Sequence, residues 1–163
     1  MKKNGSSESA RQHHEVRELR TGDVEKGFLE TLGNLSDTGG LSPKEARNII
    51  TTIRRNPLYH VFVAAASDGQ VVGTTTLIVE QKFIHRGGLV GHIEDVAVRR
   101  GYEGKGVGGS LVAAAVEKAK ELGCYKCILD CKAELVDFYE RLGFRRHDVG
   151  MRIDLKPKRP RKR

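Results

Sequence analysis

The stretch IEDVAVRRGYEGKGVGGSLVAAAVEKAKELG, residues 93–123, decides the fold. Its first residues, up to Val98, are largely apolar and predict a buried strand. Glycines recur between 101 and 109, and apolar side chains at helical spacing follow from Ser110 to Leu122. Gly123 stands where a helix commonly ends. The stretch therefore predicts a strand, a glycine-rich loop and an amphipathic helix.

The glycine-rich loop has the composition of an anion site. Glycines let successive backbone N–H groups converge on one point, and the N-terminus of a helix adds a partial positive charge. The pattern predicts a phosphate or pyrophosphate site. It matches neither a Rossmann fingerprint nor a P-loop, in which the lysine follows the loop, whereas Lys105 lies inside it. A flexible linker is the alternative, which the flanking strand and helix disfavour.

The rest of the chain alternates between the two periodicities. Ser42, Pro43 and Glu45 predict a helix start with a capping box, and that helix is expected to end near Arg55. Residues 67–70, SDGQ, predict a hairpin turn. Further strands are predicted at 16–19, 60–66, 71–80, 89–98 and 126–131, further helices near Asp23 and at 135–142, and a last strand or strand pair at 144–155. This order predicts an α/β fold, a mixed sheet with helices on both faces.

Length and charge predict one domain at residues 15–155. Residues 1–14 are polar and predict a disordered leader. Residues 156–163 form a basic tail with six Lys and Arg. Without the tail, 23 cations face 21 anions, so the net charge falls from +8 to +2. The tail is interpreted as a solvated end, with a nuclear address or a nucleic-acid or membrane contact as alternatives. Neither a signal peptide nor a membrane span is apparent, which predicts a soluble, cytoplasmic protein.

The three cysteines are Cys124, Cys127 and Cys131. Their odd number, without a secretory signal, disfavours disulfides. Cys124 and Cys127 form a C-x-x-C pair, but a structural zinc site needs four ligands and no second pair follows. No metal is predicted, and the thiols are interpreted as small side chains on an apolar strand that includes residue 131.

The loop also carries a family resemblance. Gly106-Val107-Gly108 resembles the acetyl-CoA-binding motif of the GNAT superfamily of N-acyltransferases, although Glu103 stands where that motif usually has Arg or Gln. The strings KFIH (82–85), GHIEDVAV (91–98), GCYKCILDC (123–131) and FYERLGF (138–144) resemble the glucosamine-6-phosphate N-acetyltransferase family. The resemblance covers about residues 15–155. It implies a GNAT-like fold with a mostly antiparallel central sheet, acetyl-CoA as co-substrate without a metal, and a homodimer.

The resemblance implies a coenzyme site at the end of the predicted strand. It implies a bulge whose amides hold the thioester and pantetheine arm, and a loop that holds the pyrophosphate. The residues so assigned are Val96, Ala97, Val98, Gly104, Lys105, Gly106, Val107, Gly108, Gly109, Tyr139 and Arg141.

The resemblance also implies an amino-sugar site. Glu94 and Asp95 match the carboxylates that line it, and Ser36 matches a hydroxyl residue that closes it. Lys82, His85, Tyr125 and Lys126 match positions that contact the sugar phosphate. The family has a basic residue where this chain has Asp154; Arg152, two residues earlier, would share its face in a strand and is assigned in its place.

The implied reaction transfers acetyl from acetyl-CoA to the amine of glucosamine 6-phosphate, on the path to UDP-N-acetylglucosamine. The amine must lose a proton, for which Glu94, Asp95 or backbone carbonyls acting through water are candidates. Amides of Val96 or Ala97 are candidate oxyanion donors. Tyr139 matches a donor to the coenzyme sulfur, and Asp130 an acid near the reacting centre. A covalent acyl group on Cys131 is the alternative to direct attack.

Two other functions remain open on sequence. One is a GNAT enzyme that acetylates a protein N-terminus, a lysine or a polyamine; the sugar-site strings oppose it. The other is a nucleic-acid or chromatin binder that uses the basic tail. The latter leaves the glycine loop unexplained, and a chain with no Trp and 6% aromatic residues has few side chains on which bases could stack.

Overall fold

The computed structural model describes residues 13–155, which form two compact units, one ending at Leu129 and the other beginning at Asp130. Most of the predicted leader and the whole basic tail therefore lie outside the described residues. His14 already belongs to the first strand, so regular structure begins before the predicted boundary at residue 15.

The first unit is built on a five-stranded sheet whose strands follow one another in chain order. The first four strands are antiparallel neighbours, and the fifth joins the fourth in parallel. This confirms the predicted mixed, mostly antiparallel sheet. The strands are β1 (His14–Glu18), β2 (Tyr59–Ala66), β3 (Val71–Gln81), β4 (Leu89–Val98) and β5 (Cys124–Leu129).

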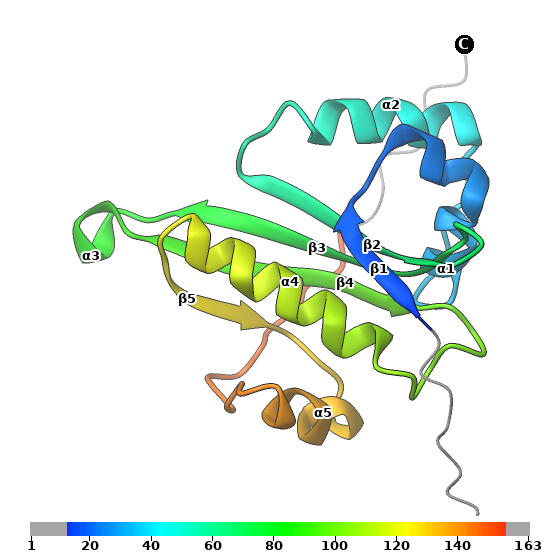
Figure 1. Ribbon diagram of the computed structural model, residues 1–163. Coiled ribbons are helices and arrows are strands. Elements are labelled where there is room, and N and C mark those ends of the chain that lie inside the picture. Colours follow the sequence, from blue (N-terminus) through cyan, green and yellow to red (C-terminus); the bar gives the residue numbers. More distant parts are fainter. Residues whose placement is uncertain (1–12, 156–163) are drawn as a thin grey trace, which may run out of the picture. The chain divides into compact units, whose positions relative to one another are not determined.

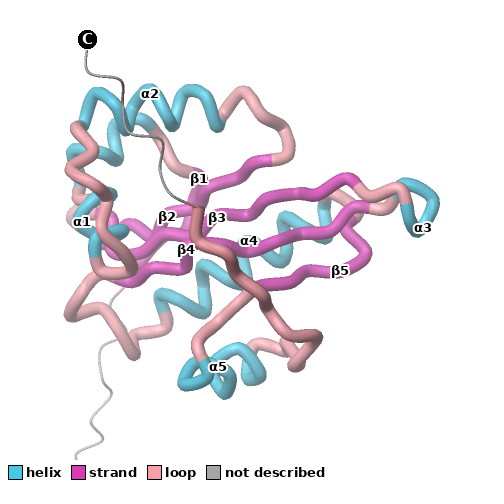
Figure 2. Tube along the Cα trace, turned by 180° about the vertical axis from the view of Figure 1, so that it is seen from behind, coloured by secondary structure: helices cyan, strands magenta, loops and turns pink. Residues whose placement is uncertain are grey.

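Helices cover both faces of this sheet, as predicted (Figures 1 and 2). In the first unit they are the 3-10 helix η1 (Thr21–Lys26), α1 (Phe28–Gly33), α2 (Pro43–Ile53) and α4 (Val107–Glu121). The single turn α3 (Ile84–Gly87) lies at the tip of the hairpin that joins β3 to β4. α4 lies across the front of the sheet in Figure 1 and behind it in Figure 2. The second unit contains the 3-10 turn η2 (Ala133–Leu135) and α5 (Val136–Arg141).

The face under α4 is packed so closely that the strands need glycine there. A Cβ at Gly73 of β3 would lie 2.6 Å from Val107 and 2.8 Å from Leu111. A Cβ at Gly91 of β4 would lie 3.0 Å from Ala119. Odd-numbered residues at this part of β4 therefore face α4, and their even-numbered neighbours face the opposite side of the sheet.

The opposite face is covered by η1, α1 and α2. Their apolar side chains form one core with β2 and β3, made of Leu19, Val24, Phe28, Ala46, Ile50, Val61, Val63 and Val71. α2 begins with the predicted capping box: Glu45 N donates to Ser42 Oγ, and Ser42 N donates to the Glu45 carboxylate at 2.9 Å. The helix ends at Ile53 rather than Arg55, within the usual uncertainty of a helix end.

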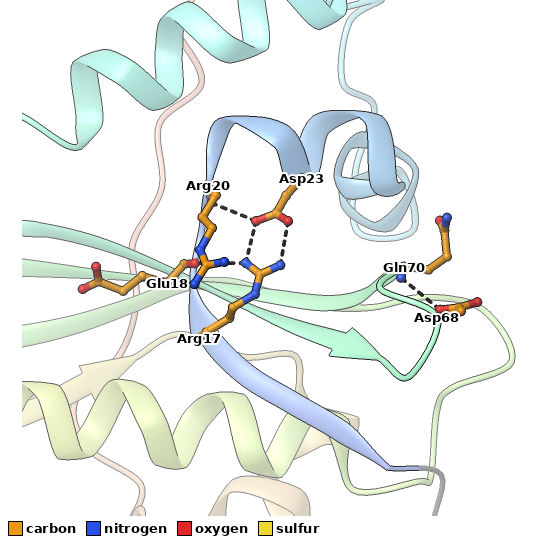
Figure 3. A network of polar contacts seen from close by, with 6 residues as sticks. All are labelled: Arg17, Glu18, Arg20, Asp23, Asp68 and Gln70. Carbon is orange, nitrogen blue, oxygen red and sulfur yellow. Dashed lines mark hydrogen bonds and ion pairs between the residues drawn. The ribbon is translucent and has the colours of Figure 1, made fainter.

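An ion pair fixes η1 to β1 (Figure 3). Both guanidinium Nη atoms of Arg17 donate to Asp23 at 2.7 Å, and Arg20 N donates to the same carboxylate at 2.8 Å. Burial alone would raise the pKa of Asp23, but the hydrogen bonds from Arg17 and Arg20 outweigh it and hold the pKa below its usual value. The sequence predicted a helix capped near Asp23. The N-cap of η1 is Arg20, and Asp23, three residues later, accepts from its backbone N–H and so anchors the turn into η1.

Three differences from the predicted elements affect the regions of the candidate site. α4 begins at Val107, so Gly108 and Gly109 form its first turn and not the loop. β5 runs from Cys124 to Leu129, so Cys131 lies beyond the strand and is exposed. In the described part of the second unit, no strand follows Phe144, although a strand was predicted there. Val149, Met151, Ile153 and Leu155 alternate as in a strand but are 81–93% exposed, because this stretch has no ladder partner within its own unit.

Candidate active site

The site is built around an irregularity in β4. Ala97 pairs with Thr74 of β3 and Glu94 pairs with Thr76, so Asp95 and Val96 stand opposite the single residue Thr75. Asp95 has φ 52°, a left-handed conformation that Asp tolerates better than most residues. The Thr75 hydroxyl donates to the Glu94 carbonyl at 3.2 Å and steadies the bulge. The bulge that the family resemblance implied is confirmed, and the extra residue of a bulge is left out of the ladder pairing.

The glycine loop follows this bulge directly. Gly101, Gly104 and Gly106 have φ of 86°, 72° and 84°, and a Cβ at any of them would meet nothing within 4 Å. Glycine is therefore needed at these positions for its positive φ and for the open approach to the backbone, and not because a neighbouring atom excludes a side chain. The first turn of α4 adds N–H groups that have no partner inside the helix. This cradle fits a pyrophosphate group.

Glu103, which replaces the usual Arg or Gln, has a structural role in this loop. Its carboxylate accepts a hydrogen bond from Gly101 N at 2.5 Å and so closes the turn that precedes the cradle. Lys105 lies with its Nζ 5.0 Å from the centroid of the Tyr102 ring. The departure from the family motif thus contributes to the shape of the loop.

The two predicted site carboxylates lie on the accessible side of the bulge. Glu94 has a side chain that is 44% exposed, and Asp95 is exposed. Burial raises the pKa of Tyr59 on β2, and the negative charges of Asp95 and Glu94 raise it further. Tyr59 is a neighbour of the carboxylate pair that the sequence did not single out, because only the pairing of β2 with β3, and of β3 with β4, brings it there.

Three of the four predicted phosphate contacts lie together near α3. The rings of His85 and Tyr125 are 4.5 Å apart, and Lys126 Nζ lies 6.0 Å from the Tyr125 ring centroid. His85 has φ 50°. A Cβ at Gly88 would lie 2.8 Å from the Tyr125 ring, so this approach requires glycine at 88.

Lys82, the fourth, belongs to a different set. It forms an ion pair with Glu80, whose other carboxylate oxygen lies 3.1 Å from His92 Nδ1. His92 Nε2 in turn lies 3.1 Å from Glu94 Oε1. The hydrogen bond from Lys82 lowers the pKa of Glu80, and the one from His92 lowers it further. Sequence reasoning missed Glu80 and His92 because their contact depends on the register of the β3–β4 pair.

The remaining predicted residue of the first unit is Ser36. It is exposed just after α1, and its backbone N–H donates to Leu32 O at 3.1 Å.

The second unit holds the other predicted catalytic residues. Tyr139 is buried and packs edge-on against Phe138 and Phe144, with centroids 4.9 and 6.0 Å away. Burial raises the pKa of Tyr139, and the nearby thiol of Cys131 raises it further. Asp130 is exposed, as are Arg141 and Cys131. The hydroxyl of Tyr139 is therefore protonated through the neutral pH range.

Arg152 and Asp154 contact each other in the C-terminal segment, although the strand on which their shared face was predicted is not formed. Arg152 Nε donates to Asp154 Oδ1 at 2.7 Å, and both side chains are exposed. The guanidinium is thus held by the acid that occupies the family's basic position.

The cysteines have the environment of structural thiols where they lie in β5. Burial raises the pKa of Cys127 to about 11, and burial also raises that of Cys124. Across residues 13–155, no group of three or more His, Cys, Asp or Glu side chains could hold a metal ion. Within the same residues, no helix is long and apolar enough to cross a bilayer.

This geometry agrees with a family match. The sequence pattern of the acetyltransferase (GNAT) family matches residues 28–144, which include the bulge, the glycine loop, α4 and α5. The chain therefore belongs to the GNAT family of acetyltransferases.

Within that family, the chain is similar to glucosamine 6-phosphate N-acetyltransferases. It is 40% identical to the one from Trypanosoma brucei brucei and 39% identical to the one from Candida albicans, in each case over 86% of this chain and 95% of the relative. The crystal structure of the Arabidopsis thaliana glucosamine-6-phosphate N-acetyltransferase has the same fold, with a TM-score of 0.86 at 33% identity. That match covers 88% of this chain and 99% of the Arabidopsis chain.

Proposed function

We propose that this chain transfers an acetyl group from acetyl-CoA to the amine of glucosamine 6-phosphate, giving N-acetylglucosamine 6-phosphate and CoA on the path to UDP-N-acetylglucosamine. The observation that carries the proposal is the similarity to glucosamine 6-phosphate N-acetyltransferases along almost their whole length. The bulge at Asp95, continuous with an open glycine cradle, supports the acetyl-CoA half of the reaction.

When bound, acetyl-CoA supplies the activated acetyl group. The chain supplies backbone amides from Gly104 to Gly109, of which the last lie in the positive N-terminal turn of α4, for the pyrophosphate. The amides of Val96 and Ala97 at the bulge bind the carbonyl oxygen as negative charge develops on it. Val98, the last residue of β4, contacts the pantetheine arm of the coenzyme. Because the donors belong to a fixed backbone, they need little rearrangement during the reaction.

The amine side of the site needs a proton acceptor, since an ammonium group has no free electron pair. Glu94 and Asp95 provide carboxylates at the bulge, within the same strand as the oxyanion donors. Tyr59 and Ser36 offer hydroxyl groups for the sugar. His85, Tyr125 and Lys126 bind the phosphate with one aromatic face and two cationic or hydrogen-bonding groups.

The departing sulfur needs a proton or a hydrogen bond. Tyr139 donates it, and its raised pKa keeps the hydroxyl protonated until the sulfur becomes basic. Asp130 acts near the same centre, and Arg141 contacts the coenzyme. The amine attacks directly, and Cys131 carries no acetyl group, because no histidine of the described residues forms a contact with its thiol that could activate it.

We also propose that the enzyme is a homodimer. The C-terminal segment from Val149 to Leu155 alternates apolar and polar residues and exposes its apolar side chains almost fully. A strand of this pattern is stabilised by pairing with another chain. A second copy provides that partner, and Arg152 then lies at the junction between the copies.

The reaction is tested by thiol release from acetyl-CoA with a panel of amines. Glucosamine 6-phosphate is expected to give the highest kcat/KM, ahead of spermidine, a lysine peptide and a peptide with a free N-terminus. Glu94→Gln is expected to lower the rate with every amine if this carboxylate accepts the proton. A clear preference for a polyamine or a peptide would replace the proposed acceptor with another GNAT substrate.

A further inference from the structure

Four ionisable side chains form a continuous row along β4 and the end of β3. The row runs from Lys82 through Glu80 and His92 to Glu94. Its two ends are Lys82, which the family resemblance assigned to the sugar phosphate, and Glu94, which belongs to the proposed amine site. Its two middle members, Glu80 and His92, have no part in the proposed reaction.

The register of the two strands produces the row. Ile78 stands opposite His92, and Thr76 stands opposite Glu94. Glu80 is therefore a diagonal neighbour of His92, and such neighbours are within reach of long side chains. His92 and Glu94 are two residues apart on β4 and share the face turned away from α4. The bulge begins after Glu94, so the row stops where the strand becomes irregular.

The carboxylates of Glu80 and Glu94 both need a hydrogen-bond donor from the His92 ring. A neutral imidazole has one donor nitrogen and one acceptor nitrogen, whereas a carboxylate only accepts. His92 Nδ1 lies 3.1 Å from Glu80, and its Nε2 lies 3.1 Å from Glu94. Both contacts are attractive when the ring carries its second proton. The ring then binds one oxygen of Glu94 and leaves the other oxygen of that carboxylate free.

A carboxylate held in this way has few orientations left. Glu94 is 44% exposed and, without a partner, would sample several rotamers. His92 is only 23% exposed and is fixed from its other side by Glu80, which Lys82 holds in turn. The orientation of Glu94 is therefore coupled to the position of Lys82 at the far end of the row.

We propose that His92 is a positioning residue for the amine-accepting site. It holds Glu94 Oε1 so that the second carboxylate oxygen faces the substrate amine, and through Glu80 it fixes the distance between that oxygen and Lys82. This inference rests on the proposed acetyltransferase function and adds a residue that aligns the acceptor. Alignment of this kind matters because a displacement of about 1 Å can lower a rate about a hundredfold.

Two isosteric variants separate the two contacts of His92. The amide of His92→Asn reaches the position of Nδ1 and can donate to Glu80, whereas the amide of His92→Gln reaches the position of Nε2 and can donate to Glu94. We expect His92→Asn to lower kcat about 10–100-fold, and His92→Gln to retain most of the wild-type kcat. The Kd for acetyl-CoA, measured by calorimetry, should stay at the wild-type value in both. Equal losses in the two variants, or a larger loss in His92→Gln, would overturn the proposal.

A double-mutant cycle with Glu94→Gln gives a second and independent test. If His92 acts through Glu94, His92→Asn should change kcat/KM by less than about twofold once Glu94 is replaced, since the coupled effects are not additive. A variant damaged in folding would instead lose activity in both backgrounds, so additive losses would also overturn the proposal. Melting temperatures of all variants are measured alongside.

The amine panel keeps this test separate from the proposed function. The wild-type enzyme is first assayed with each amine, and the His92 variants are then compared on the best acceptor. A preference for another amine would refute glucosamine 6-phosphate as the substrate and leave the comparison of Asn and Gln intact. The expected difference between those two variants would then still support the role of His92.

Discussion

Gly106 offers the sharpest test of the coenzyme cradle. It caps α4 at φ 84°, and a Cβ there would meet no atom within 4 Å. Gly106→Ala therefore introduces no collision, but an L-residue in the left-handed region costs about 1–2 kcal/mol. If the loop relaxes to escape this strain, binding must restore its shape, and the Kd for acetyl-CoA should rise about 5- to 30-fold. Isothermal titration calorimetry measures that change directly.

Gly123 supplies a matched control at the other end of the same helix. It has φ 79° and is equally open, so Gly123→Ala carries a similar strain. It should lower the melting temperature without changing the Kd for acetyl-CoA, because the 15-residue helix α4 separates Gly123 from the loop. The reasoning fails if Gly106→Ala binds acetyl-CoA as the wild type does, or if both variants lose affinity equally.

Three further predictions concern stability, chemistry and assembly. Asp23→Asn should destabilise the protein by about 3 kcal/mol, as removal of one partner from a buried ion pair does. Because the folded-state pKa of Asp23 is lowered, its contribution is full above the unfolded-state pKa of about 4 and is lost as the pH falls further, through the lower folded-state pKa, so urea titrations of variant and wild type should converge in acid. Tyr139→Phe should lower kcat about 10²–10³-fold with little change in the KM for acetyl-CoA and should remove the basic limb of the pH–rate profile; a near-normal kcat would show that solvent protonates the sulfur. Analytical ultracentrifugation should give a mass near twice 18.1 kDa, with Ile153→Lys shifting it toward the monomer, and a monomeric wild type would contradict the dimer.

The fold could be predicted well because its local signals agree with its tertiary structure. The capping box at Ser42, the hairpin turn at Asp68 and the terminating glycine at 123 each act over a few residues. The strand Leu89–Val98 was predicted with its observed bounds. The prediction of a C-terminal strand was wrong. The alternation of apolar and polar residues there shows that the segment is suited to a strand, but not that a neighbouring strand is present in the same chain.

The site residues, too, could be predicted where the signal is local in the sequence and could not be predicted where it depends on strand pairing. The glycine loop could be predicted because its chemistry lies in consecutive residues. The bulge at Asp95 followed from the family resemblance, since nothing in the composition of β4 marks an extra residue. Tyr59, Glu80 and His92 could not be found from the sequence, because the pairing register of β3 with its neighbours decides which side chains meet.

The measurement that bears most directly on the central claim is the ratio of kcat/KM for glucosamine 6-phosphate to that for unphosphorylated glucosamine. His85 and Lys126 lie together with Tyr125 at one end of the proposed sugar site. Charge-assisted hydrogen bonds to a phosphate contribute about 1.5–3 kcal/mol each, so two such bonds predict a ratio of at least about a hundred. Equal kcat/KM values for the two sugars would contradict both the phosphate site and the assignment of glucosamine 6-phosphate as the substrate.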